Sequence, residues 1–220
     1  AGRVGSSRTA ARRSGRSGWP RPPGPEVVGM LKRICVFCGS SDGGRPAYTE
    51  AAEALGAALA DRGQTLVYGG ARVGLMGAVA RAALDAGGDV IGVMPRGIVE
   101  REVAYERLTD LRVVRDMAER KALMDQLSDG FVALPGGFGT LDELSEMLVA
   151  AQLGWHAKPM GLLNVAGYYD GALAWIARAV EDGFIPARHA ELLHVAPRPD
   201  ALLDAEVRLN KVALADETGL

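Results

Sequence analysis

The chain has little of what several common classes of protein require. Only 5% of its 220 residues are aromatic, which leaves few side chains on which nucleic-acid bases could stack. No run of about 18 apolar residues occurs, so we expect no membrane-spanning helix. The formal net charge is only −2, so the chain as a whole has no strong electrostatic bias. We therefore predict neither a nucleic-acid partner nor a membrane partner.

Cysteine is scarce, and both residues lie in Cys35-Val36-Phe37-Cys38. A C-x-x-C pair can bind a metal or carry redox chemistry. Here the pair falls in a predicted strand, where residues three apart face opposite sides, and no second pair exists to complete a zinc site. We interpret both thiols as structural and predict no metal. Two unpaired thiols without an apolar signal sequence favour a cytoplasmic location.

Several catalytic signatures are also missing. The chain has no G-x-S-x-G nucleophile motif, no H-E-x-x-H metal motif and no cysteine placed with a histidine. None of its histidines adjoins a glycine turn, so we interpret all three as non-catalytic: His156, His189 and His194. We therefore expect neither triad chemistry nor metal chemistry.

The first 29 residues differ in composition from the rest. They contain six arginines and Glu26, a balance of +5, so the remaining residues carry −7 of the net charge of −2. Gly, Ser, Arg and Pro dominate, and such a segment has little to bury. We expect residues 1–29 to be a disordered basic leader. We expect residues 30–220 to form a single domain that begins near Met30.

Beyond the leader, short apolar runs alternate with amphipathic stretches. We predict strands at about 33–38, 65–68, 90–94, 109–114, 131–134, 159–163 and 192–195. We predict a loop at 95–107, and helices at about 47–62, 74–86, 117–128, 140–154, 170–182 and 199–209. Near-continuous apolar strands joined by helices indicate a parallel sheet covered on both faces. The predicted fold class is therefore α/β, with a doubly wound, Rossmann-like sheet.

Glycines follow three of the predicted strands, at Gly39, Gly69-Gly70 and Gly136-Gly137. In doubly wound sheets, ligands bind beyond the carboxyl ends of the strands, where the backbone must approach them closely. A purely structural protein has no need for several glycine turns on one rim. We therefore predict a binding site at this edge of the sheet.

The most informative stretch is Leu134-Pro135-Gly136-Gly137-Phe138-Gly139-Thr140-Leu141-Asp142-Glu143. A glycine turn between a strand and a helix leaves free N–H groups at the positive end of the helix dipole, which attracts phosphate. The stretch lacks the Lys-Ser/Thr of a P-loop and the third small residue of the dinucleotide fingerprint. Thr140 and Glu143 also match a capping box at the start of a helix. A phosphate site and an ordinary helix cap therefore both fit these residues.

A second predicted helix start carries two adjacent cations. Asp116 and Glu119 match a capping box, and Arg120 and Lys121 follow in or just after the first turn. Exposed cations are disfavoured there by about 0.3–1 kcal/mol each. We favour the interpretation that the pair faces an anion, although two solvated surface charges also fit.

These two stretches together resemble the LONELY GUY family of cytokinin riboside 5′-monophosphate phosphoribohydrolases. The resemblance covers roughly residues 33–205 and extends to Val36-Phe37-Cys38-Gly39-Ser40-Ser41, Val67-Tyr68-Gly69-Gly70, Gly74-Leu75-Met76-Gly77 and Gly161-Leu162-Leu163-Asn164. It implies a Rossmann-type fold, usually a homodimer. It also implies hydrolysis of the N-glycosidic bond of N6-modified adenosine 5′-monophosphates, or of AMP, without a cofactor.

The resemblance further implies roles for particular residues. Arg120 and Glu143 would be catalytic. Substrate contacts would come from Glu102, Lys121, Gly136, Gly137, Phe138, Gly139, Thr140, Leu141 and Asp142. Family members often have Thr-Trp where this chain has Val149-Ala150, and the loss of that hydroxyl bears on base selectivity. Relatives are often labelled lysine decarboxylases, but no residue pattern here indicates a pyridoxal phosphate site.

The implied chemistry fits the residues on physical grounds. Cleavage of a nucleotide N-glycosidic bond develops positive charge on the ribose, which a nearby carboxylate stabilises. The glycine turn would hold the 5′-phosphate, with Arg120 as a further cation and Glu143 as the carboxylate. The alternative is a non-catalytic nucleotide or molybdenum-cofactor carrier of related fold, which has no use for that carboxylate. The sequence does not separate a cytokinin-nucleotide enzyme from one that acts on AMP.

Overall fold

The computed structural model describes residues 31–99 and 105–205. The expectations for the leader 1–29, for Glu102 and for residues 206–209 lie outside these ranges. Within the described ranges, no helix is both long enough and apolar enough to span a membrane.

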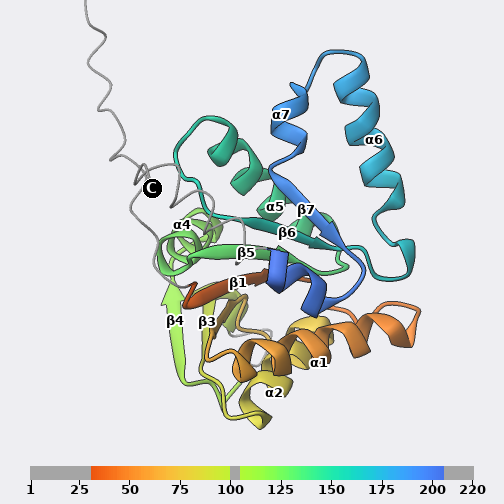
Figure 1. The fold of residues 1–220 in the computed structure, drawn as a ribbon. Coiled ribbons are helices and arrows are strands. Elements are labelled where there is room, and N and C mark those ends of the chain that lie inside the picture. The colour runs from red at the N-terminus through yellow and green to blue at the C-terminus, as the bar shows by residue number, and fades with distance from the viewer. Residues whose placement is uncertain (1–30, 100–104, 206–220) are drawn as a thin grey trace, which may run out of the picture.

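Seven parallel strands form one sheet in the order β4-β3-β2-β1-β5-β6-β7 (Figure 1). They are β1 (Arg33–Phe37), β2 (Thr65–Tyr68), β3 (Val90–Pro95), β4 (Asp110–Val114), β5 (Gly130–Ala133), β6 (Met160–Leu163) and β7 (Leu193–Ala196). The inner strands are almost wholly buried because they are apolar on both faces, whereas the edge strands β4 and β7 are partly exposed. The doubly wound parallel sheet is confirmed.

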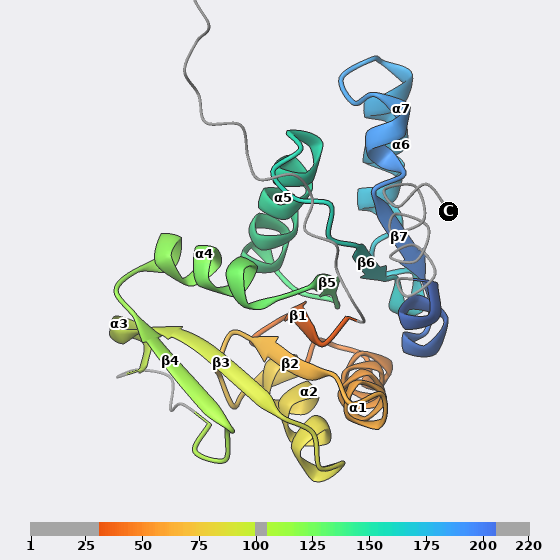
Figure 2. The ribbon, with the colours of Figure 1, turned by 60° about the vertical axis from the view of Figure 1, so that its left-hand side comes forward.

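Helices cover both faces of the sheet (Figure 2). They are α1 (Pro46–Asp61), α2 (Gly74–Asp85), α3 (Arg96–Val99), α4 (Met117–Leu127), α5 (Phe138–Gln152), α6 (Asp170–Glu181) and α7 (Ala187–Ala190), with a 3₁₀ turn at Val165–Gly167. A last helix begins at 199 and continues to the end of the described residues at 205. The helices α1 and α2 pack on one face, and α4 and α5 pack on the other. The short elements α3, α7 and the 3₁₀ turn were not predicted.

The cysteine pair follows the strand geometry. Cys35 is buried in the core beneath α4 and α5, whereas Cys38 is buried in the core beneath α1 and α2. Both are free thiols. The opposite orientation expected for residues three apart in a strand is confirmed.

The strand order reverses direction at β1, which pairs with β2 on one side and with β5 on the other. The chain therefore leaves β1 and β5 toward opposite sides, and a crevice opens beyond their carboxyl ends. The two glycine turns meet there, because the Gly39 N–H donates to the Pro135 carbonyl at 3.0 Å. The edge predicted from the glycine turns is thus the switch point of the sheet.

Candidate active site

A cavity of about 320 Å³ lies at this switch point. The ends of β1, β2 and β3 form its floor, and the first turns of α4 and α5 form its walls. Both helices begin at the cavity, so their positive dipole ends are directed toward it. The site therefore favours an anionic group before any side chain is considered.

The first turn of α5 is built to accept an anion. Gly137 occupies the N-cap position, and no side chain in the described part of the chain caps the helix. The first N–H group with an intrahelical bond belongs to Leu141, which donates to Gly137 at 3.2 Å. The N–H groups of Phe138, Gly139 and Thr140 precede it and have no intrahelical acceptor. These residues line the cavity, so their donors are available to a phosphate.

The capping-box interpretation of Thr140 and Glu143 is wrong. The helix begins at Phe138, two residues earlier than predicted, so Thr140 lies inside the first turn and is only 3% exposed. Gly136 makes this tight turn possible, because a Cβ at that position would lie 2.0 Å from the Thr140 hydroxyl oxygen. The glycine is therefore required by the close approach of the turn to its own helix.

Arg120 and Glu143 form a buried ion pair at the centre of the cavity. Arg120 Nη1 donates to Glu143 Oε1, and Arg120 Nε donates to the Val93 carbonyl of β3 at 3.0 Å. Gly69 lies beneath the guanidinium, since a Cβ there would be 2.4 Å from Arg120 Nη2. The guanidinium is thus fixed by Glu143 and by the Val93 carbonyl. It occupies space that a side chain at position 69 would fill.

The surroundings change the acidity of Glu143. Burial raises the pKa of this carboxyl above its ordinary value, and the charge of Arg120 opposes the rise. Removing a carboxylate from water disfavours its charged form, and a neighbouring cation favours it. A carboxyl whose pKa is raised in a cleft is a frequent mark of acid–base chemistry.

The N-terminus of α4 is capped largely as predicted. Asp116 accepts a hydrogen bond from the Glu119 N–H at 2.9 Å. The Glu119 carboxylate reaches back to the N–H of Arg115 rather than to that of Asp116, at 2.8 Å. The helix therefore has a well-defined start, which places Arg120 one turn inside it.

The two adjacent cations do not share a target. Lys121 Nζ pairs with Asp142 Oδ2 at 2.9 Å and also with Glu146, on the outer side of α5. Successive residues on a helix point about 100° apart, so Arg120 enters the cavity and Lys121 does not. Asp142 and Lys121, both expected near the substrate, therefore lie outside the cavity.

Two other residues implied by the resemblance also lie elsewhere. Gly136 borders a neighbouring cavity, where its carbonyl accepts a hydrogen bond from the Tyr168 hydroxyl at 2.6 Å. Leu141 lines a separate apolar groove between α5 and α6. The residues brought together at the cavity are Arg120, Gly137, Phe138, Gly139, Thr140 and Glu143.

The structure adds residues that the sequence did not indicate. Ser40 and Cys38 come from the turn after β1, which the glycine pattern could have suggested. An apolar side of the cavity consists of Met76, Met94, Pro95, Ile98 and Met117. The three histidines do not line it.

A doubly wound sheet with a cavity and an uncapped helix start at its switch point defines an α/β protein whose site is suited to an anionic ligand. A family model described as "Possible lysine decarboxylase" matches residues 76–205. The chain is 54% identical over 79% of its length to the "Probable cytokinin riboside 5′-monophosphate phosphoribohydrolase LOGL9" of Oryza sativa subsp. japonica, covering 76% of that protein. It is 48% identical over 81% of its length to the cytokinin riboside 5′-monophosphate phosphoribohydrolase LOG1 of Arabidopsis thaliana, covering 84% of that protein. The chain belongs to the LONELY GUY family.

Solved structures support the fold. The molybdenum cofactor carrier protein of Chlamydomonas reinhardtii superposes with a TM-score of 0.62 at 24% identity, covering 82% of this chain and 98% of that one. The molybdenum cofactor binding protein of Rippkaea orientalis has a TM-score of 0.59 at 22% identity, covering 87% of this chain and 100% of that one. At these identities the likeness concerns the α/β architecture alone.

Proposed function

We propose that the protein hydrolyses the N-glycosidic bond of purine nucleoside 5′-monophosphates, either AMP or its N6-modified cytokinin forms, to the free base and ribose 5-phosphate. The observation that carries the proposal is the buried Arg120–Glu143 pair beside the uncapped start of α5. The names of relatives about half identical in sequence support the substrate class.

The spacing along α5 suits a ribose phosphate. With the phosphate at the N–H groups of residues 138–140, Glu143 lies about 5–8 Å further along the helix axis, given a rise of 1.5 Å per residue. This separation matches the reach from a 5′-phosphate across a ribose to its anomeric carbon. One group therefore binds the phosphate while another acts at the bond to be broken.

Glu143 and Arg120 have different roles in the proposed reaction. As the bond to the base lengthens, the Glu143 carboxylate stabilises the positive charge on the ribose and accepts a proton from the attacking water. The water oxygen bonds to the anomeric carbon, the bond electrons leave with the base, and the proton is returned to the base. Arg120, fixed by the Val93 carbonyl, orients the carboxylate and adds positive charge toward the phosphate.

The description "Possible lysine decarboxylase" does not suit this site. A pyridoxal phosphate enzyme needs a lysine amine at the cofactor to form a Schiff base. The lysines of the described ranges are Lys32, Lys121 and Lys158, and none of them lines the cavity. The bonds of Lys121 to Glu146 and Asp142 also raise its pKa, which opposes a nucleophilic amine.

A comparison of AMP with adenosine tests the proposal most directly. Donors built to hold a phosphate are left unpaired by adenosine, and such sites reject the deficient analogue by up to about 10⁴. We expect kcat/KM for AMP to exceed that for adenosine by a factor of this order, with ribose 5-phosphate as product. Near-equal values would refute the phosphate site. Isopentenyladenosine monophosphate, assayed in the same preparation, distinguishes a cytokinin enzyme from an AMP enzyme.

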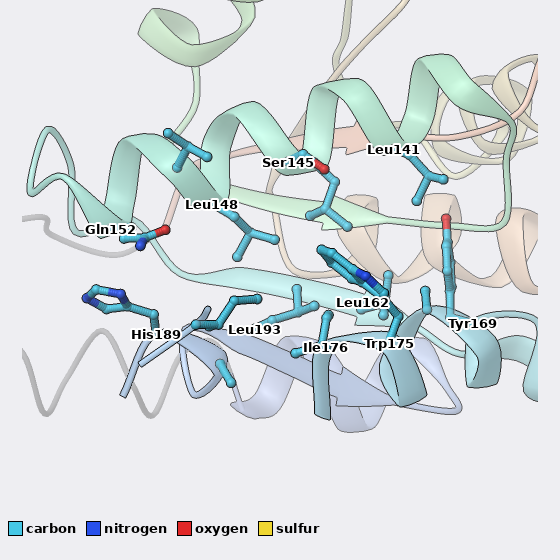
Figure 3. A pocket seen from close by; sticks show the side chains of 15 residues that line it. Leu141, Ser145, Leu148, Gln152, Leu162, Tyr169, Trp175, Ile176, His189 and Leu193 are labelled. Atoms are coloured by element: carbon cyan, nitrogen blue, oxygen red, sulfur yellow. The ribbon is translucent and has the colours of Figure 1, made fainter. Parts of the chain in front are cut away.

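We also infer that the protein forms a homodimer through the apolar groove between α5 and α6 (Figure 3). Leu141 and Leu148 of α5 face Trp175 and Ile176 of α6 across this groove. Trp175, which lines this groove, is 67% exposed. Monomeric proteins rarely expose contiguous apolar surface of this kind. A second copy would bury it.

The association state tests the dimer directly. Trp175→Asp should shift the mass measured by light scattering to that of a monomer, because the charge would be buried in the interface. The control is Val113→Asp, which alters an exposed residue on the edge strand β4. A wild-type monomer, or a dimer that survives Trp175→Asp, would contradict the inference.

The free, buried thiols support a cytoplasmic location for this protein.

A further inference from the structure

Two bridges join α4 and α5 at neighbouring positions. The inner bridge is the Arg120–Glu143 pair, which is buried in the cavity. The outer bridge runs from Lys121 to Asp142 and Glu146. Because each helix contributes consecutive residues, the two bridges connect the same pair of helical turns. Any movement of α4 that separates the outer bridge also displaces the inner one.

The helix α4 is held mainly by the sheet beneath it rather than by α5. Its buried residues are Arg120 and Met124, and Leu123 and Leu127 pack partly buried against the same core. It packs on the strands, but its backbone approaches that of α5 closely at few points. At its far end, Lys158 Nζ donates to the Asp125 carbonyl and carboxylate, each at 2.7 Å. Lys158 lies between α5 and β6, so this bridge joins the far end of α4 to the chain entering the sheet, and the bridges at the start of α4 join it to α5.

We propose that Lys121 is a positioning residue, whose bridge to Asp142 and Glu146 sets α4 against α5 so that Arg120 meets Glu143. This inference rests on the proposed function, and it gives Lys121 and Asp142 a role different from the substrate contacts that the family resemblance implies. The Lys121 side chain is only 16% exposed and is directed away from the cavity, which leaves it no path to a substrate there.

The expected signature is a loss of turnover without a comparable loss of stability. Bridges with exposed partners contribute little to folding, and Asp142 and Glu146 are both about half exposed. A displacement of about 1 Å in a catalytic group, by contrast, can cost up to about 10²-fold in rate. The main phosphate donors are N–H groups of α5, which a shift of α4 leaves in place, so KM should change less than kcat.

The test compares three variants on AMP: Lys121→Met, Asp142→Asn with Glu146→Gln, and all three changes together. We expect kcat to fall about 10-fold in each, with the triple variant no worse than the others, because all remove one bridge. Lys121→Arg should restore most of kcat, because its guanidinium still reaches both carboxylates. If Lys121 instead binds substrate, Lys121→Met raises KM while the neutralised carboxylates leave kcat unchanged. That result would overturn the proposal.

The chain offers a closely matched control. Arg62 bridges to Asp204 at 2.9 Å and to Asp200 at 4.0 Å, two carboxylates one helical turn apart, as Asp142 and Glu146 are. Arg62 ends α1 just before β2, so it lies at the amino ends of the strands, whereas the cavity lies at their carboxyl ends. Arg62→Met should therefore leave kcat unchanged, and an equal loss there would refute a specific effect of Lys121.

A second measurement separates this proposal from the proposed function. Amide hydrogen exchange in the first turns of α4 should quicken in Lys121→Met and in the variant with both neutralised carboxylates, but not in Arg62→Met. This readout needs no substrate. If the wild-type protein does not hydrolyse AMP, the proposed function fails, while unchanged exchange in all variants would overturn the positioning role alone.

Discussion

Replacing Glu143 by Gln is the most informative single change, because it removes a charge and keeps the shape of the side chain. The structure places this carboxyl against Arg120 in the cavity, about one turn from the N–H groups at the uncapped start of α5. Groups that move protons or stabilise charge in a transition state contribute roughly 10²–10⁴-fold in rate. We expect kcat on AMP to fall by a factor in this range.

The cost in stability should be smaller than for a typical broken ion pair. Removing one partner of a buried pair costs about 3–5 kcal/mol when the other charge is left without compensation. Here the amide oxygen of Gln can still accept from Arg120 Nη1, and the desolvation that raises the pKa of Glu143 disappears with the charge. We therefore expect a loss below that range, measured as the free energy of unfolding in urea.

The assay follows ribose 5-phosphate at saturating AMP, and the control is Glu53→Gln. Glu53 pairs with Arg81 at 3.2 Å, and both side chains are about half exposed, so its loss should cost less than about 1 kcal/mol and leave kcat unchanged. A loss in Glu143→Gln below about threefold, in a protein that unfolds normally, would show that this carboxylate does not take part in the chemistry.

Three further outcomes follow from the same site. Arg120→Lys should lose most activity, since an ammonium cannot reach the Val93 carbonyl and Glu143 together; wild-type kcat would contradict this. Gly69→Ala should lower kcat by displacing the guanidinium and cost about 1–3 kcal/mol by overpacking, whereas Gly171→Ala, which meets open space, should not affect kcat. Because burial raises the pKa of Glu143, kcat should rise with pH through a value above the ordinary carboxyl range. Protonation of the same group favours the folded state, so its contribution to stability should decline as pH rises through that interval, and Glu143→Gln should abolish both effects.

The sheet could be predicted from the sequence because its strands are apolar on both faces. Runs such as Ile34–Phe37 and Phe131–Ala133 are apolar throughout, so they match a strand buried on both faces and not an amphipathic helix. The glycine turns after the strands indicate the edge of the sheet where ligands bind. The sequence predicts the start of α5 two residues late, because Thr140 matches a helix cap and the preceding Phe138-Gly139 is not typical of a helix. The tight turn at Gly136-Gly137, rather than the helix propensity of the residues, determines where α5 begins.

The parts of the site that involve distant residues could not be derived from local pattern. The pairing of Arg120 with Glu143 joins two helices, and only the family resemblance suggested it. Lys121 was grouped with Arg120 because they are adjacent in sequence, although helical geometry turns them apart. Met94 belongs to no motif, and an apolar side chain at the end of a strand is indistinguishable from a core residue in the sequence.

The internal pairing of Arg120 with Glu143 also has a kinetic consequence for the empty enzyme. The two charges compensate each other, so they project little field into solution. The residues beyond the leader carry −7, and a nucleotide monophosphate is itself an anion. Long-range attraction therefore cannot accelerate the encounter, and under the proposed function selectivity for the phosphate would arise only at contact, from the N–H groups at the start of α5. The association rate should accordingly stay flat or increase as salt screens the surrounding negative charge, the opposite of an electrostatically steered enzyme.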